Sequence, residues 1–308
     1  MKIVFLDAST LGSASLEPIR KCGELVTYPT STRQQALERV REAEVIITNK
    51  VVIDDEMMDA APSLRLICEA ATGVNNIDLA AADRRGIPVR NVAGYSTDAV
   101  VQLTFALLLQ LVCRTGQHDG WIKDGGYSRS PIFTDTSAPF MELSGKTMGI
   151  IGMGTIGQKV ASIATAFGMK VIYFSTSGTS HCTDYPSVPL EELLAVSDVV
   201  SIHAPLNERT RNLIGAKELA MMKGSAFIIN IGRGGIVGEA ALADAISNGI
   251  IAGAGLDVFV KEPLPADNPL LHTAHPERLC LTPHIGWASA EAIGRLVTGI
   301  AENINSSL

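Results

Sequence analysis

The sequence has few aromatic and charged residues and no pattern that pairs its cysteines. Of the 308 residues, 5% are aromatic, 19% are charged and 46% are hydrophobic, which is typical of a compact folded protein. The cysteines are scattered, odd in number and without a CxxC spacing: Cys22, Cys68, Cys113, Cys182 and Cys280. Neither a disulfide framework nor a metal site is therefore expected. Reduced thiols predict a cytoplasmic protein.

Long runs of one kind are also missing. The net charge is −7 and no extended basic run occurs, so neither nucleic acid nor an anionic membrane is an expected partner. The longest apolar stretch, residues 99–113, is interrupted by polar side chains and is shorter than the roughly 20 residues of a membrane span. Residues 1–7 turn acidic at once, so they predict a first strand rather than a signal peptide.

Short apolar segments alternate with helical patterns along most of the chain, which predicts parallel sheets covered by helices on both faces. Strands are expected at 3–7, 45–48, 64–69, 89–91, 147–151, 169–174, 199–203, 226–230 and 253–257. Helices are expected at 32–43, 55–61, from Thr97, and at 158–167, 190–196, 238–247 and 288–306. Residues 116–144 are polar and aromatic and predict an arm. If the last helix packs on the first sheet, one domain comprises residues 1–96 plus 283–308, and the other 97–282.

The most informative stretch is Gly152-Met153-Gly154-Thr155-Ile156-Gly157, between an expected strand and an expected helix. Gly152 allows a tight turn, Gly154 lets the backbone approach a phosphate, and Gly157 lets the helix lie against the strand. The helix N-terminus adds N–H groups and the positive end of its dipole. With a second strand following, this unit predicts a dinucleotide-binding domain.

Ser175 ends the second strand, where an acidic residue usually holds the ribose hydroxyls of NAD. Serine lacks the charge that repels a 2′-phosphate. The following stretch to His181 contains no Lys or Arg, whereas NADP-binding proteins typically carry an arginine nearby. We therefore expect NAD as the coenzyme, and NADP use stays open.

Three side chains capable of acid–base or anion chemistry follow later strands: Arg233, Glu262 and His284. Ligands of open α/β sheets bind outside the carboxyl ends of the strands, so the three are expected in one cleft. Arginine offers a planar, bidentate partner for a carboxylate. Histidine can donate a proton to a carbonyl oxygen near neutral pH, and a carboxylate beside it fixes its tautomer. Together they suit hydride transfer to a keto acid.

At this point the chain resembles the D-isomer-specific 2-hydroxyacid dehydrogenase family. The resemblance extends over nearly the whole chain, through Gly-Met-Gly-Thr-Ile-Gly, Ile-Asn-Ile-Gly-Arg-Gly-Gly, Gly-Leu-Asp-Val-Phe and Thr-Pro-His-Ile-Gly-Trp. It implies a Rossmann coenzyme domain inserted in a flavodoxin-like substrate domain, both doubly wound α/β. It also implies that Arg233, Glu262 and His284 are catalytic, and that a homodimer forms through the helix after Thr97.

The resemblance further implies which residues contact the two ligands. Asp257 is expected at the nicotinamide carboxamide, and the backbone of the loop 71–76 is expected at the substrate carboxylate. The expected coenzyme contacts are Thr97, Gly152, Gly154, Thr155, Ile156, Gly157, Ser175, His203, Pro205, Ile231 and Asp257. The expected substrate contacts are Thr72, Gly73, Val74, Arg233 and His284.

Residues 91–98 and Trp287 are similar to the glycerate dehydrogenase, or hydroxypyruvate reductase, branch. A small hydroxylated keto acid is therefore the expected substrate. Phosphoglycerate, D-lactate and phosphite dehydrogenases are alternatives, and Lys50 is the only extra cation for a phosphorylated substrate among the first domain's strand ends. A second alternative is a corepressor that binds NAD(H), as some proteins similar to this family do.

Overall fold

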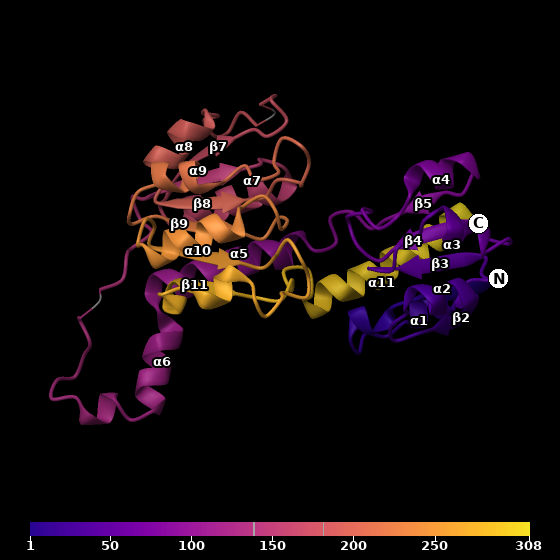
Figure 1. Cartoon of the computed structure of the whole chain (residues 1–308), viewed down its shortest axis with the longest axis horizontal. Coiled ribbons are helices and arrows are strands. Elements are labelled where there is room, and N and C mark those ends of the chain that lie inside the picture. Colours follow the sequence, from indigo (N-terminus) through magenta and orange to yellow (C-terminus); the bar gives the residue numbers. More distant parts are fainter. Residues whose placement is uncertain (138, 181) are drawn as a thin grey trace. The chain divides into compact units, whose positions relative to one another are not determined.

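The computed structural model describes residues 1–137, 139–180 and 182–308 and divides into two compact units (Figure 1). Unit 1 comprises Met1–Ser96 and Trp287–Leu308, and unit 2 comprises Thr97–Gly286. The first boundary agrees with the expected one, but unit 2 ends at residue 286 rather than at 282. The difference has a physical cause, because the N–H groups of Ile285 and Gly286 bond to Asp257 within unit 2.

Unit 1 contains a five-stranded parallel sheet with the flavodoxin-like order β2-β1-β3-β4-β5. Its strands are β1 (Lys2–Phe5), β2 (Glu24–Thr27), β3 (Val45–Thr48), β4 (Leu66–Glu69) and β5 (Val89–Arg90). Every residue of β3 and β4 is buried, as expected for parallel strands covered on both faces. The edge strand β2 has no fully buried residue and no apolar run, so the sequence did not predict it.

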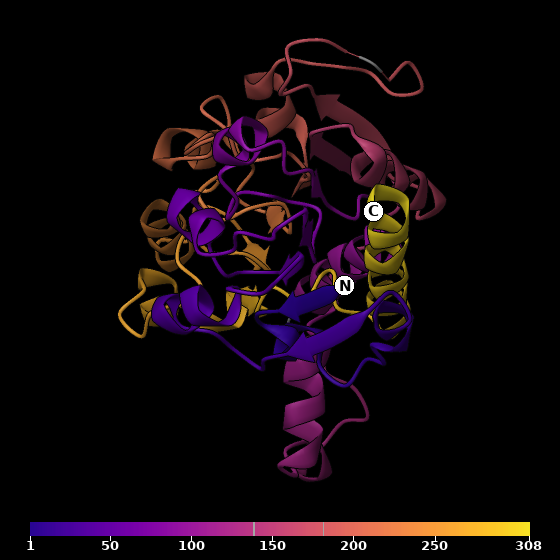
Figure 2. The ribbon, with the colours of Figure 1, turned by 90° about the vertical axis from the view of Figure 1, so that its right-hand side faces the viewer.

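The last helix of the chain completes unit 1. The helices are α1 (Glu17–Arg20), α2 (Arg33–Arg39), α3 (Asp55–Asp59), α4 (Leu79–Arg84) and α11 (Ala290–Ser307), with the 3-10 turn η1 (Ala8–Leu11). Ser289 caps α11 by accepting a hydrogen bond from the N–H of Ala292. The helix then buries Leu296, Ile300 and Ile304 and contacts α1 and β4. Figure 2 shows this helix in yellow.

Unit 2 contains a six-stranded parallel sheet in the order β11-β10-β9-β8-β6-β7. Its strands are β6 (Thr147–Ile151), β7 (Lys170–Phe174), β8 (Val199–Ile202), β9 (Phe227–Asn230), β10 (Gly253–Leu256) and β11 (Leu279–Leu281). A parallel bridge between Tyr173 and Ser187 adds a reduced third strand beyond β7. With this bridge, unit 2 has the 3-2-1-4-5-6 order of dinucleotide-binding sheets, so the expected fold class is confirmed.

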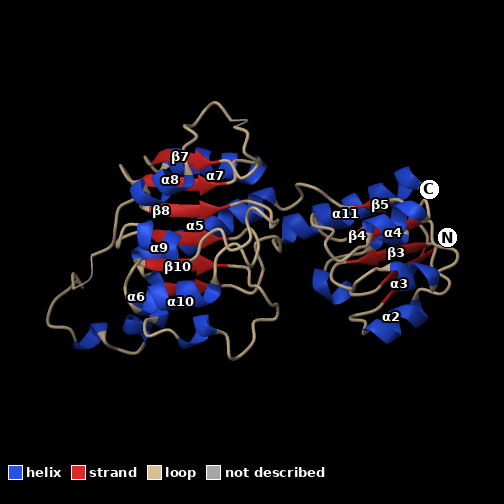
Figure 3. Cartoon of the chain, turned by 45° about the horizontal axis from the view of Figure 1, so that its top comes forward, coloured by secondary structure: helices blue, strands red, loops and turns tan. Residues whose placement is uncertain are grey.

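Helices cover the unit 2 sheet in two clusters, and Figure 3 shows the strands of each unit side by side. One cluster involves α5 (Thr97–Cys113) and α7 (Thr155–Ala166), which pack against each other. The other involves α8 (Leu190–Val196), α9 (Ala216–Met221) and α10 (Glu239–Ser247), with the turns η3 (Pro269–His272) and η4 (Pro276–Arg278) nearby in the sequence.

The segment expected as an arm contains α6 (Thr115–Lys123) and η2 (Tyr127–Arg129). No residue of α6 is buried, and Phe133, further along, is 87% exposed. Within the described residues, no single helix is long and apolar enough to cross a membrane. Only α5 and α6 together reach that length, across a 60° bend.

Each sheet has one place where the strand order reverses direction: between β1 and β3 in unit 1, and between β6 and β8 in unit 2. Open parallel sheets bind ligands outside the carboxyl ends of their strands at such a switch point. The segments that follow the strands at this edge of each sheet are therefore where the chemistry of each unit is expected.

Candidate active site

The glycine turn occupies the switch point of unit 2. Gly152 follows β6 with φ +94°, and a Cβ there would lie 2.9 Å from the backbone nitrogen of Ala204. A Cβ on Gly157 would lie 2.3 Å from the carbonyl oxygen of Gly152. Both positions therefore require glycine. A Cβ on Gly154 would meet nothing within 4 Å, so this side of the turn is open.

The start of α7 is suited to an anion. Gly154 is its N-cap residue and offers no side chain to the first N–H groups, and Thr155 and Ile156 form the first turn. Unpaired N–H groups and the helix dipole favour a negative charge at such an end. Open space above Gly154, next to these donors, fits the pyrophosphate of a dinucleotide.

The segment after β8 lies against the glycine turn and carries an unsatisfied nitrogen. His203 bonds through Nε2 to the hydroxyl of Ser201 at 2.8 Å. Its Nδ1 is buried and has no hydrogen-bond partner among the described residues. Burial lowers the pKa of His203 to about 4, so the ring is neutral near pH 7. A buried ring nitrogen without a partner beside the phosphate turn is a further feature that fits a bound coenzyme.

Four other predicted coenzyme residues are spread around unit 2. Ser175 follows β7 and donates its hydroxyl to the carbonyl oxygen of Thr179 at 2.6 Å. Pro205 is exposed, and its carbonyl oxygen accepts the hydroxyl of Thr210. Ile231 directly follows β9 and is buried in the cluster with α5, where Thr97 is the first residue. Their contacts with a coenzyme stay predictions.

Arg233 is held by a compact turn after β9. Asn230 accepts the N–H of Gly232 through its side-chain oxygen, and its side-chain nitrogen donates to the carbonyl oxygen of Arg233 at 3.0 Å. A Cβ on Gly234 would lie 1.9 Å from the carbonyl oxygen of Phe259. Because glycine has no Cβ, the turn that contains Arg233 can pack against the segment that leads to Glu262. The half-buried Arg233 side chain donates to the carbonyl oxygen of Gly232.

The structure brings Glu262 and His284 into direct contact. The Nδ1 atom of His284 lies 2.7 Å from Oε2 of Glu262, while Oε1 accepts the N–H of Phe259 at 3.0 Å. A carboxylate accepts only, so Nδ1 carries the proton and Nε2 is left for another partner. The side chains are 26% and 31% exposed, which leaves the pair accessible to a small molecule.

Asp257 accepts hydrogen bonds from residues on both sides of His284 in the sequence and so positions the histidine. It is 1% exposed, and its Oδ1 accepts from the Thr282 hydroxyl at 2.6 Å and from the N–H of Ile285 at 2.8 Å. Its Oδ2 accepts from the N–H of Gly286 at 2.7 Å. Burial raises the pKa of Asp257, and these three hydrogen bonds act in the opposite direction.

These hydrogen bonds fix both sides of His284, whose φ of +56° is uncommon for a residue other than glycine. An acidic residue directly after an apolar strand is the only sequence signal for this positioning role. The predicted contact of Asp257 with the nicotinamide stays a prediction.

The predicted substrate loop belongs to unit 1 and follows β4. The Thr72 hydroxyl donates to the carbonyl oxygen of Val92, and the carbonyl oxygen of Thr72 accepts from Asn91 at 2.6 Å. Gly73 and Val74, which follow Thr72 in this loop, are half-buried. Arg233, Glu262 and His284 all belong to unit 2.

A buried carboxyl that the sequence analysis did not consider lies at the base of this loop. Glu69 ends β4, is fully buried, and accepts from the side-chain nitrogen of Asn76 at 3.0 Å. Its Oε1 has no hydrogen-bond partner among the described residues. Burial raises the pKa of Glu69 to about 8.

No metal site is found among the residues that the structure describes, since no three or more His, Cys, Asp or Glu side chains lie close enough together to hold a metal ion.

Comparison with known proteins agrees with this geometry. Residues 105–286 match the family model described as "D-isomer specific 2-hydroxyacid dehydrogenase, NAD binding domain". A hydroxypyruvate reductase of Blautia hydrogenotrophica is 35% identical, over 100% of this chain and 97% of its own. A glycerate dehydrogenase of Methylorubrum extorquens is 37% identical, over 99% and 95%. The crystal structure of the TT0316 protein from Thermus thermophilus has a TM-score of 0.91 at 36% identity, over 100% and 96%.

The chain therefore belongs to the D-isomer-specific 2-hydroxyacid dehydrogenase family. It is an oxidoreductase that acts on CH–OH donors with a nicotinamide coenzyme, so the predictions of family and enzyme class are confirmed. The prediction of NAD(P) as the coenzyme is also confirmed. The comparisons give no support to the corepressor alternative.

Proposed function

We propose that this enzyme reduces hydroxypyruvate or glyoxylate to the corresponding D-2-hydroxy acid or its achiral counterpart, using NAD(P)H. The observation that carries the proposal is the accessible pair of His284 and Glu262, 2.7 Å apart, in the unit that holds the glycine turn. The printed names of the relatives from Blautia and Methylorubrum support this substrate class.

Each predicted residue has a role in this reaction. The bound coenzyme supplies the hydride. Protonated His284 donates its Nε2 proton to the substrate carbonyl oxygen, and Glu262 orients the ring through the hydrogen bond from Nδ1. Arg233 binds the substrate carboxylate with its planar guanidinium, and the N–H groups of Gly73 and Val74 add donors. In the reverse direction neutral His284 accepts the hydroxyl proton.

The test is a panel of keto acids assayed with NADH and NADPH. It comprises hydroxypyruvate, glyoxylate, pyruvate and 3-phosphohydroxypyruvate, with phosphite assayed in the oxidative direction. We expect kcat/KM to be highest for hydroxypyruvate or glyoxylate with at least one coenzyme. Hydroxypyruvate ranking far below pyruvate would overturn the substrate assignment, and a preference for the phosphorylated acid would implicate Lys50 instead.

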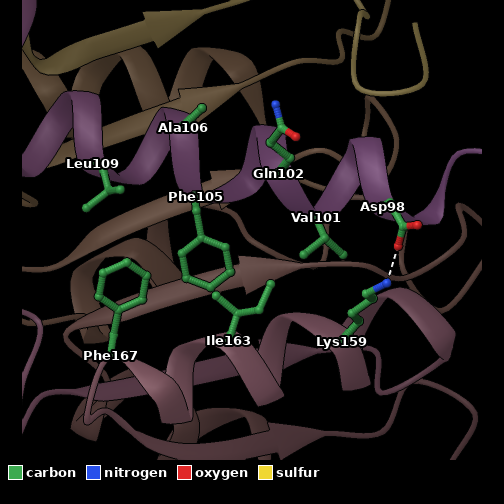
Figure 4. A pocket seen from close by; sticks show the side chains of 9 residues that line it. All are labelled: Asp98, Val101, Gln102, Phe105, Ala106, Leu109, Lys159, Ile163 and Phe167. Atoms are coloured by element: carbon green, nitrogen blue, oxygen red, sulfur yellow. Dashed lines mark hydrogen bonds and ion pairs between the residues drawn. The ribbon is translucent and has the colours of Figure 1, made fainter. Parts of the chain in front are cut away.

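We further propose that the enzyme is a cytoplasmic homodimer that uses the outer face of α5. An apolar hollow on this face is lined by side chains of α5 and α7 and by the residue after α7 (Figure 4). Phe105 and Phe167 stack there with ring centroids 5.6 Å apart, and Lys159 pairs with Asp98 nearby. Phe167 is 40% exposed in the single chain, so a second copy would remove apolar surface from water.

Light scattering after size-exclusion chromatography tests the dimer. We expect twice the chain mass for the wild type and a shift towards the chain mass for Phe105→Asp, measured across a dilution series. A wild-type mass equal to one chain at all concentrations would refute it. The free cysteines support a reducing compartment, and the net charge of −7 argues against nucleic acid or membrane partners.

A further inference from the structure

The loop after β7 contains a cluster of hydroxyl groups and one cation. The hydroxyl of Ser175 lies 3.1 Å from that of Ser177, and both donate to the carbonyl oxygen of Thr179. The guanidinium of Arg209 comes from a segment about thirty residues later and donates to the carbonyl oxygen of Ser177 at 3.0 Å. A Cβ on Gly178 would lie 3.7 Å from the same Arg209 nitrogen, so the guanidinium lies along this loop.

The backbone beneath Arg209 is held in place. The side-chain oxygen of Asn207 accepts the N–H groups of Arg209 and Thr210, at 2.9 and 3.2 Å. Thr210 is 1% exposed, and its hydroxyl donates to the carbonyl oxygen of Pro205. The segment that carries Arg209 is thus a closed turn anchored after β8, and only the exposed side chain remains free to rearrange around a ligand.

The position of this cluster identifies the part of the coenzyme that it would meet. In a dinucleotide-binding sheet, the residue that ends the second strand contacts the adenosine ribose. Here that residue is Ser175, and the N–H of Gly152 in the phosphate turn bonds to the carbonyl oxygen of Phe174 just before it. Among the described residues, Arg209 makes no ion pair with a carboxylate within 4 Å. A cation beside hydroxyl donors, without an acidic partner, suits a phosphate group.

We propose that Arg209, together with the hydroxyls of Ser175 and Ser177, binds the 2′-phosphate of NADPH, so that the enzyme prefers NADPH to NADH. This assignment rests on the proposed function for its reaction but concerns only the adenosine end of the coenzyme. It favours NADPH over NAD(H), the coenzyme expected from residues 175–181. The last residue of that stretch, His181, lies outside the described residues. That expectation considered only neighbours in sequence, whereas Arg209 comes from the segment after β8.

Binding of adenosine nucleotides tests this assignment without catalysis. We expect calorimetry to give at least tenfold tighter binding of 2′,5′-ADP than of 5′-AMP to the wild type. Arg209→Met should weaken 2′,5′-ADP about 10- to 100-fold and leave 5′-AMP within about twofold, since one charge-assisted contact is lost. Arg211→Met, an exposed arginine two residues further on, is the matched control and should change neither affinity.

Steady-state kinetics provide the second measurement. The ratio of kcat/KM for NADPH over NADH should exceed ten in the wild type and fall towards one in Arg209→Met. Ser175→Asp should reduce it further, because a carboxylate repels the 2′-phosphate. Equal binding of the two nucleotides by the wild type, or an unchanged 2′,5′-ADP affinity in Arg209→Met, would overturn the assignment. If no keto acid is reduced but the nucleotide contrast persists, the substrate proposal fails and this assignment stands.

Discussion

The two units have parallel sheets of the same kind, but their switch points are filled differently. In unit 2 the turn after β6 contains Gly152 and Gly154, and a Cβ on Gly154 would meet no atom within 4 Å, which leaves room for an anion. In unit 1 the second residue after β1 is Asp7, whose carboxylate accepts the N–H groups of Asn49, Lys50 and Val51 after β3. The protein's own carboxylate thus lies at the switch point of unit 1, whereas no side chain of the glycine turn covers the switch point of unit 2. Sheets of similar topology therefore differ in the side chains near their switch points, and these side chains determine whether the switch point is open to a ligand.

Titratable groups are also divided between the units. All six histidines belong to the range of unit 2, at positions 118, 181, 203, 272, 275 and 284. Buried carboxyls occur in both units: Asp7 and Glu69 in unit 1 and Asp257 in unit 2. An imidazole that exchanges protons near neutral pH can therefore come only from unit 2 of this chain.

Removing the imidazole should give the largest effect and test this division most directly. We expect His284→Asn to lower kcat about 10²- to 10⁴-fold, because the general acid is lost. Asparagine tolerates the positive φ at this position, so the backbone should persist. His275→Asn is the control and should retain activity, since the His275 side chain is 42% exposed and pairs with Glu277. A kcat near the wild-type value in His284→Asn would place the proton donor elsewhere.

Placing a carboxylate at the switch point of unit 2, as Asp7 does in unit 1, should remove coenzyme binding. In Gly154→Asp, a carboxylate would stand where the pyrophosphate is expected, and repulsion of about 4 kcal/mol at about 4 Å corresponds to a roughly 10³-fold weaker Kd. The fold should be kept, since a Cβ at Gly154 meets nothing within 4 Å. Calorimetric titration with NADPH measures the loss, and Gly154→Ala separates the effect of charge from that of size. An unaltered Kd in Gly154→Asp would exclude this turn as the phosphate site.

Removing the carboxylate at the switch point of unit 1 should lower the free energy of unfolding and leave coenzyme affinity unchanged. Asp7→Asn replaces one accepting oxygen with an NH₂ group that faces backbone N–H donors, so we expect a loss of about 1–3 kcal/mol in the free energy of unfolding. Urea denaturation at pH 7 measures it, with the exposed Asp83→Asn as the control. Equal midpoints for Asp7→Asn and the wild type would show that these donors do not depend on the carboxylate.

The smallest predicted effect concerns pH and Glu69. Burial raises its pKa from 4.5 to about 8, so the folded protein keeps a proton that the unfolded chain releases above about pH 4.5. This group's contribution to stability is therefore complete at low pH and falls as pH rises towards 8. Between pH 6.5 and 7.5 the fall is at most about 1.4 kcal/mol.

Glu69→Gln mimics the protonated carboxyl and should flatten the curve over this range, with its advantage over the wild type growing as pH rises. Urea denaturation at both pH values gives the two slopes. Parallel slopes for Glu69→Gln and the wild type would contradict the raised pKa.

The sequence predicted the architecture well because its signals are local. The expected strands at 45–48 and 147–151 and the helix at 190–196 have the observed bounds, since apolar runs and flanking turn residues mark them. Short or partly exposed elements such as β2 and α6 lack such patterns and were missed. The first turn of α7 was also missed, because its start at Thr155 lies inside the glycine motif.

The chemistry of the sites was predictable only where a motif carries it. Residue types suggested that Arg233, Glu262 and His284 belong together, and the structure adds the hydrogen bond between the last two. The hydrogen-bond donors to Asp7 are 42 to 44 residues away in the sequence, and the carbonyl group that accepts from Arg209 is 32 residues away. Such long-range pairs depend on how the chain folds back on itself, and no spacing rule reveals them.

The return of α11 to unit 1 sets the order in which the chain can fold during synthesis. Unit 2 is continuous in sequence and can form as soon as its last strand emerges from the ribosome. The sheet of unit 1 is completed later, because α11, which contacts β4, follows unit 2 in the chain. At about 5–20 residues per second, this delay is roughly 10–40 s, during which an apolar sheet face stays uncovered. A nascent chain of this kind is a natural client for chaperones that shield such surfaces.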